Sequence, residues 1–201
     1  PRRRELLEQI GISFEVRVSD KEEVYHSLIP EEIVKELALS KAENVADDLR
    51  EKQEQVKQIS FDKKNNVLLD TIVIGADTIV VSDGSILGKP KDEADAVRMI
   101  RSLQGRSHKV YTGVAILDYD DEGKRKSVVH AVETEVFVNP MSDEEIREYA
   151  ATGEPLDKAG AYGIQGQFAA YIERIDGDYY NVVGLPVSYV YRQLKEIAEK
   201  D

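Results

Sequence analysis

The stretch VLLDTIVIGADTIVVSDGSILGKPKD, residues 67–92, decides the fold, because it reads as a buried strand with an acidic residue in its middle. Residues 72–74 and 79–81 are all Ile or Val, which is typical of a core strand. Asp77 lies between these two groups. Acidic side chains are rarely buried without a partner. Asp77 is therefore either an inert residue at a strand end or bulge, hydrogen-bonded to the backbone, or a functional group at the mouth of a cleft.

The neighbours of Asp77 favour the functional interpretation. Gly75 and Ala76 precede it and allow another group to approach the backbone closely, and Thr78 adds a hydroxyl group. A carboxylate in such a place can hold a divalent metal ion or accept a proton from water. We therefore expect the site to lie against this strand.

The rest of the chain alternates between helical and strand patterns. We expect helices at residues 2–10, 30–49, 91–105, 142–153 and 186–200, and further strands at 12–18, 108–119 and 127–138. Asp92 is the expected N-cap of the third helix, and Ser142 with Glu145 forms a capping box at the fourth. Because the turn at 120–123 makes the last two strands an antiparallel hairpin, the predicted fold is α/β or α+β with a mixed sheet. The long hairpin indicates a twisted sheet that spans two lobes, with a cleft between them.

The composition limits the classes of protein to consider. A chain of 201 residues fits one domain or two closely joined lobes. Residues 50–66 are charged and lose the helical period, which predicts a surface insertion. No apolar run reaches the roughly 18 residues of a membrane span, and the chain has no cysteine, which fits a reducing compartment. We expect a cytoplasmic protein without a membrane partner.

The formal net charge of −12 predicts weak binding to nucleic-acid polymers, because phosphate neutralisation needs clustered cations. Any phosphate group must then be bound by a few local cations or a metal ion. Lys89, directly after Gly88, is the stronger candidate, whereas Lys91 is expected to be solvated. Arg2–Arg4 open a helix, where positive charge is unfavourable, so they either meet an anion or are solvated beside acidic neighbours.

The segment GEPLDKAGAYGIQGQ, residues 153–167, is rich in glycine, which usually serves close backbone approach. Its Gln165 offers an amide donor and acceptor side by side, a pattern that suits the N3–H and O4 edge of uracil or thymine. The chain has no P-loop, no dinucleotide-binding glycine motif and no nucleophile elbow. Its three histidines lack metal-site spacing.

Five blocks in chain order resemble the Maf family of nucleotide pyrophosphatases: PRRRELL, GADTIVVSDGSILGKPKD, LQGRSHKVYTGV, EPLDKAGAYGIQG and IDGDYYNVVGLP. The resemblance implies an inosine-triphosphate-pyrophosphatase-like fold, a single domain over residues 1–201 with its charged insertion at about 50–66, and a homodimer. Family members carry an apolar strand and an S-x-S turn before the PRR block. We therefore expect that first strand to be missing before Pro1.

The same resemblance implies the chemistry, which is hydrolysis of a nucleoside triphosphate to the monophosphate and pyrophosphate with a divalent cation, Mg²⁺ or Mn²⁺. Asp77 resembles the general base and a metal ligand, and Glu23 resembles a second metal ligand, with Glu22 as a rival for that position. The groups that resemble phosphate contacts are Arg2, Lys41 and Lys89.

Residues at three positions distinguish the branches of the family that act on different substrates. Arg2, Thr78 and Gln165 match the branch that acts on dTTP and UTP, whereas the branch that prefers 7-methyl-GTP has Trp, Gln and Glu there. The implied function is a house-cleaning dTTP/UTP pyrophosphatase. Two alternatives stay open: a pyrophosphatase for modified purine nucleotides, and a nucleotide-binding regulator of septation, since the family is linked with arrest of cell division.

Overall fold

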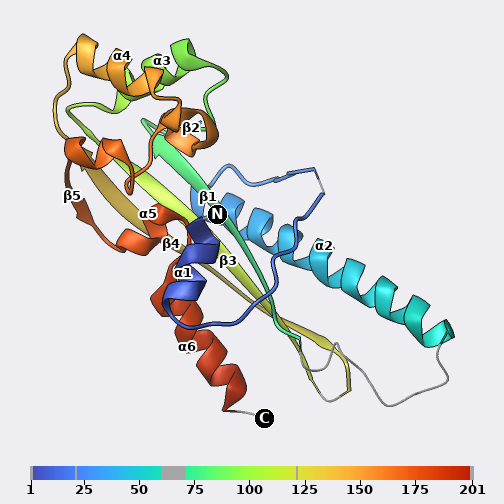
Figure 1. Ribbon diagram of the computed structural model, residues 1–201. Helices are drawn as coiled ribbons and strands as arrows, with labels where there is room; N and C mark the ends of the chain where they lie inside the picture. The colour runs from blue at the N-terminus through green and yellow to red at the C-terminus, as the bar shows by residue number, and fades with distance from the viewer. Residues whose placement is uncertain (1, 21, 60–70, 121, 200–201) are drawn as a thin grey trace.

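The computed structural model describes residues 2–20, 22–59, 71–120 and 122–199. A long, twisted sheet of five strands in the order β2-β1-β3-β4-β5 forms its centre (Figure 1). The strands are β1 (Val73–Ser82), β2 (Ser85–Leu87), β3 (Ser107–Tyr119), β4 (Arg125–Val138) and β5 (Ile172–Asp176). All the described pairings are antiparallel. The predicted class, helices packed on a long twisted sheet, is confirmed, but the expected mixed sheet is not, because each described strand pairs only with antiparallel neighbours.

Helices cover both faces of this sheet (Figure 1). The helices are α1 (Arg2–Gln9), α2 (Pro30–Ile59), α3 (Glu93–Leu103), α4 (Asp143–Ala151), α5 (Tyr179–Val183) and α6 (Val187–Ala198), with short 3₁₀ turns η1 (Glu154–Asp157), η2 (Ala159–Ala161) and η3 (Gln167–Tyr171). Helix α2 packs on one face, while the larger apolar core lies on the other, beneath α3 and α4. No helix in the described part of the chain is both long and apolar enough to cross a membrane.

Helix α2 lies unusually close to the sheet because two strand residues opposite it are glycines. A Cβ atom added to Gly75 would lie 2.3 Å from the carbonyl oxygen of Ala38, and one added to Gly113 would lie 2.1 Å from that of Val34. Carbon and oxygen atoms do not approach so closely without displacement of the backbone. Gly75 therefore makes room for helix α2, which is the group whose close approach to the backbone the small residues before Asp77 predicted.

The local capping predictions are confirmed. Asp92 accepts a hydrogen bond from the backbone N–H of Asp95 at the start of α3, and Ser142 and Glu145 form the reciprocal capping box of α4. These interactions join residues three apart, so the sequence alone specifies them.

Two expectations about elements are wrong, and the alternative that placed Asp77 at a strand end or bulge is excluded. Residues 12–18 form no strand, and Val16 and Val18 are 60% and 80% exposed, because no described strand lies beside them to pair with their backbone. Helix α2 continues past residue 49 to Ile59, so residues 50–59 of the expected insertion are helical, and its residues 60–66 lie outside the described chain. Asp77 is neither at a strand end nor in a bulge, since it pairs with Gly113 in an unbroken register.

Candidate functional site

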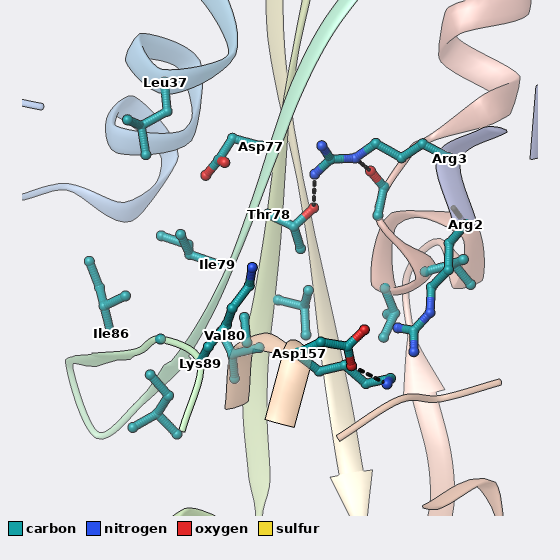
Figure 2. Close-up of a pocket in the computed structure, with 18 of the residues that line it drawn as sticks. Arg2, Arg3, Leu37, Asp77, Thr78, Ile79, Val80, Ile86, Lys89 and Asp157 are labelled. Carbon is teal, nitrogen blue, oxygen red and sulfur yellow. Dashed lines mark hydrogen bonds and ion pairs between the residues drawn. The ribbon is translucent and has the colours of Figure 1, made fainter. Parts of the chain in front are cut away.

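A cleft of about 870 Å³ runs along β1, between α2 on one side and the glycine-rich segment on the other. Its walls also include α1, β2 and the end of α5 (Figure 2). All the site residues expected from the sequence line it: Arg2, Glu23, Lys41, Asp77, Thr78, Lys89 and Gln165. The rival Glu22 is exposed and does not line the cleft.

Asp77 is the buried acidic group of the cleft. Its Oδ1 atom lies 2.6 Å from Nζ of Lys41, and the same Nζ lies 2.7 Å from Oε1 of Glu23. The side chain of Asp77 is 11% exposed, whereas that of Glu23 is 60% exposed. Lys41 thus joins a buried carboxylate to one at the mouth of the cleft.

The pleat of β1 decides which residues meet α2. Asp77 shares a face with Gly75, and the close approach of α2 at Gly75 brings Lys41 against the carboxylate. Thr78 lies on the opposite face, and Figure 2 shows the two side chains pointing to different sides of the strand. The cleft therefore extends around the edge of β1 and combines groups from both faces of the sheet.

Burial and charge act against each other on the pKa values of this pair. Burial raises the pKa of Asp77 and outweighs the hydrogen bond from Lys41 and the positive charge of Arg3, which both lower it. Burial lowers the pKa of Lys41, but the hydrogen bonds to Asp77 and Glu23 outweigh burial, so the pKa of Lys41 is raised overall. A carboxylate with a raised pKa is a stronger base than an exposed aspartate, and the lysine beside it stays charged.

Arg3 is a site residue that the sequence marks only as a member of the basic cluster Arg2–Arg4. Its guanidinium donates to the carbonyl of Ala76 over 2.7 Å, to Oγ1 of Thr78 over 3.2 Å and to the carbonyl of Gly184 over 2.8 Å. Burial lowers the pKa of Arg3, but an arginine side chain remains protonated. Arg3 thus holds both neighbours of Asp77, at a point where β2 no longer pairs with β1. The PRR block of the family resemblance contains Arg3, but no other feature of the sequence indicated its role.

Thr78 lies in the cleft, but its hydroxyl group is already engaged. Oγ1 of Thr78 accepts from Arg3 and lies 2.9 Å from Oγ1 of Thr112, which in turn donates to the carbonyl of Asn181. Through these hydrogen bonds Thr78 connects β1 to β3 and, by way of Thr112, to α5.

Two cations of the cleft have no acidic partner among the described residues. Arg2 and Lys89 line the cleft and form no ion pair with a described carboxylate, and Figure 2 shows the two side chains on either side of Asp157. Lys158 also lines the cleft, but its Nζ donates to Asp157 and to the carbonyl of Glu154. Arg2 and Lys89 are therefore the cations available for an anionic ligand. Lys91 does not line the cleft, as expected.

The glycine-rich segment brings side chains close to its backbone, as predicted. A Cβ atom on Gly163 would lie 2.7 Å from Nη2 of Arg2 and 2.8 Å from Cε of Lys158. Gln165 follows two residues later, with an exposed side chain at the cleft. The glycine therefore lets two cations lie over the turn that carries Gln165.

Two acidic residues of the cleft, Glu23 and Asp77, are placed so that they could bind one metal ion that a ligand also binds. Glu23 and Asp77 both contact one ammonium nitrogen, so both carboxylates lie within reach of a single positive centre. The described residues contain no group of three or more His, Asp or Glu side chains that could hold a metal ion by themselves. Mg²⁺ typically uses one or two carboxylates together with substrate phosphates and water, so two carboxylates fit that mode.

Comparison with known proteins gives a consistent result. The family model described as Maf-like protein matches residues 1–197. A dTTP/UTP pyrophosphatase of Agathobacter rectalis is 45% identical over 197 residues, which cover 98% of this chain and 93% of that protein. Proteins of the same name from Bacillus cytotoxicus and Alkaliphilus metalliredigens are 47% identical over 199 residues and 46% identical over 188 residues. These matches cover 98% and 93% of this chain, and 91% and 86% of the two relatives.

Proposed function

The chain belongs to the Maf family, and we propose that it is a nucleoside triphosphate pyrophosphatase that hydrolyses dTTP and UTP to the monophosphate and pyrophosphate. The relatives named dTTP/UTP pyrophosphatase align over nearly the whole chain, which supports this activity. One observation carries the proposal: a buried carboxylate with a raised pKa lies in the same cleft as two cations that form no ion pair with a described carboxylate.

In this proposal Asp77 is the general base. It takes a proton from a water molecule while the water oxygen forms a bond to the α-phosphorus. The bond between the α-phosphorus and the oxygen that bridges to the β-phosphate breaks, and its electron pair leaves with pyrophosphate. Lys41 orients the carboxylate through the contact of 2.6 Å. General-base catalysis of this kind contributes about 10²–10⁴-fold to a rate.

Arg2 and Lys89 are the proposed phosphate contacts. Their charges would stabilise the negative charge that develops on the phosphate oxygens. Lys41 is the third expected phosphate contact, but its ammonium group is engaged by both carboxylates. We therefore assign Lys41 first to the orientation of Asp77.

We further propose that Asp77 and Glu23 hold a divalent cation, Mg²⁺ or Mn²⁺, together with the substrate. Such an ion, when bound, would neutralise phosphate charge. We also propose that the protein acts in the cytoplasm as a homodimer, on the family resemblance alone. Light scattering coupled to size-exclusion chromatography tests the dimer.

Gln165 is the proposed reader of the base. Its amide NH₂ would donate to O4, and its carbonyl oxygen would accept from N3–H, which uracil and thymine both offer. In the same orientation of the amide, cytosine presents the inverse pattern and would leave both partners unpaired. Because a buried unpaired polar group costs about 1–3 kcal/mol, we expect at least about tenfold discrimination against CTP.

The direct test is the release of pyrophosphate from dTTP, UTP, CTP and GTP with Mg²⁺ or Mn²⁺. We expect dTTP and UTP to have the highest kcat/KM. Gln165→Glu removes the donor and should lower kcat/KM for both without a comparable loss for GTP, whose guanine edge presents donors. Equal hydrolysis of CTP and UTP by the unmodified protein, or unchanged ratios in the variant, would remove Gln165 as the base reader.

A further inference from the structure

The direction of the Gln165 side chain depends on the backbone turn that carries it. Gln165 is the third residue of the turn Gly163–Gly166, which is closed by a hydrogen bond of 3.0 Å from the N–H of Gly166 to the carbonyl of Gly163. The preceding Ile164 is buried in the main core, whereas the Gln165 side chain is exposed. Among the described residues, the Gln165 side chain has no hydrogen-bond partner. The turn, and not a neighbouring side chain, therefore fixes where the Gln165 side chain leaves the backbone at the cleft.

A single hydrogen-bond network holds both ends of this turn. The N–H of Gly163, at its start, donates to Oη of Tyr149 over 3.3 Å. The hydroxyl of Tyr149 donates to Oε1 of Glu154 over 3.0 Å. The other carboxylate oxygen of Glu154, Oε2, accepts over 3.0 Å from the N–H of Gln167, directly after the turn. The start and the end of the turn are thus joined through two side chains.

These two side chains lie behind the turn and not in the cleft. Neither Tyr149 nor Glu154 lines the cleft. Tyr149 is 3% exposed, and burial raises its pKa, so its hydroxyl group stays protonated and can donate to the carboxylate. A Cβ atom on Gly166 would lie 2.0 Å from Oε1 of Glu154, so the carboxylate lies directly against the turn backbone. The network therefore has the close contact that is needed to fix the turn.

We infer that Tyr149 and Glu154 are positioning residues for base selection, because together they hold the Gly163–Gly166 turn in the conformation that presents the Gln165 amide to the base. The inference rests on the proposed function, in which Gln165 reads the pyrimidine edge. A hydrogen bond discriminates between bases only when its donor and acceptor are held in place. If the turn moves, the amide can adapt to cytosine, and the preference for UTP falls.

The test uses Tyr149→Phe, which removes one hydroxyl group and keeps the ring that packs against Phe168 at a centroid distance of 5.1 Å. Glu154→Gln is the second variant, because it replaces one of the two oxygens that accept from Tyr149 and Gln167 with an NH₂ group, which can only donate. The matched control is Glu145→Gln. The Glu145 carboxylate accepts a hydrogen bond of 2.7 Å from the backbone N–H of Ser142 at the other end of α4, away from the turn. Thermal unfolding identifies any variant that fails to fold.

The main measurement is the ratio of kcat/KM for UTP to that for CTP. Loss of one hydrogen bond that holds the turn should lower this ratio by about two- to tenfold in Tyr149→Phe and in Glu154→Gln. The ratio should stay unchanged in Glu145→Gln. Hydrogen exchange at residues 163–167 should become faster in the first two variants only.

A double-mutant cycle separates a positioning role from general loosening of the fold. In a Gln165→Ala background, Tyr149→Phe should no longer change the ratio, because the group that it positions is gone. A change that persists in that background overturns the inference, as does a ratio that falls no further in Tyr149→Phe than in Glu145→Gln.

Failure of the proposed function would look different. If the unmodified protein releases no pyrophosphate from any nucleotide, the proposed function fails. The ratio of Kd values for UTP and CTP, measured by calorimetry on the same variants, then replaces kcat/KM. An unchanged Kd ratio in Tyr149→Phe overturns the inference, and a reduced one supports it.

Discussion

Substitution of Gly75 by Ala tests whether the close packing of α2 on β1 creates the site. The added Cβ atom would lie 2.3 Å from the carbonyl oxygen of Ala38 and 2.8 Å from the backbone nitrogen of Ala42. A comfortable carbon–oxygen contact is about 3.3 Å. The helix must therefore withdraw from the strand by about 1 Å, since both clashing atoms belong to the backbone and cannot rotate away.

This displacement has two expected consequences. Overpacking of a core typically costs about 1–3 kcal/mol of unfolding free energy. For a chain of this size, each kcal/mol lowers Tm by about 2–4 °C. Lys41 lies one residue before Ala42, so the contact of 2.6 Å to Asp77 should lengthen with the helix. A misplacement of about 1 Å in a catalytic group can cost about 100-fold in rate, so kcat/KM should fall together with stability.

Urea unfolding and pyrophosphate release from UTP measure the two consequences. The control for stability is Gly88→Ala, because a Cβ atom there meets nothing within 4 Å and the backbone φ is not positive. We expect Gly88→Ala to unfold within about 0.5 kcal/mol of the unmodified protein. If Gly75→Ala keeps both its urea midpoint and its activity, the close approach of α2 does not create the site and the reasoning is refuted.

Three further predictions follow from the site and the core. Asp77→Asn should lower kcat by about 10²–10⁴-fold while the Kd for UTP changes little, because the amide keeps the shape but cannot take a proton; a rate like that of the unmodified protein removes Asp77 from the mechanism. Lys89→Ala and Arg2→Ala should raise KM for UTP and GTP alike, since phosphate carries no base identity, and a changed dTTP-to-GTP ratio would reassign either residue. Burial lowers the pKa of His108 from 6.5 to about 4. Between these two pH values the histidine is protonated in the unfolded chain but not in the folded one. The free energy of unfolding should therefore fall by about 3 kcal/mol as the pH is lowered from 6.5 to 4. Urea unfolding across this range should show a shallower fall in His108→Gln, and equal slopes would contradict the assignment.

Features that depend on residues close together in the chain could be predicted without the structure. The caps at Asp92 and at Ser142 with Glu145 join residues three apart, and both are present. The β3–β4 hairpin follows from two apolar runs around a short turn. Such interactions need no information about the rest of the fold, because the partners are already adjacent in the chain.

The candidate site could be predicted in part for a different reason. Asp77 was noticeable because an acidic residue is unusual in a buried strand, and Gln165 because it lies among glycines. Both residues line the cleft. Lys41 and Glu23 carried no such local signal and were found through the family resemblance. A lysine on a helix and a glutamate in a charged segment have the same local appearance whether they are functional or solvated.

The contacts of these residues, and the packing reason for glycine at position 75, follow from the folded chain and not from local sequence. Lys41 meets Asp77 across 36 residues, and Arg3 meets Ala76 and Gly184 across 73 and 181 residues. Residues 12–18 alternate between apolar and polar side chains as a strand does. They nevertheless form no strand, because no described strand lies beside them to pair with their backbone. Periodicity and capping act over a few residues, whereas the contacts of a side chain and the partner of a strand depend on where distant parts of the chain return.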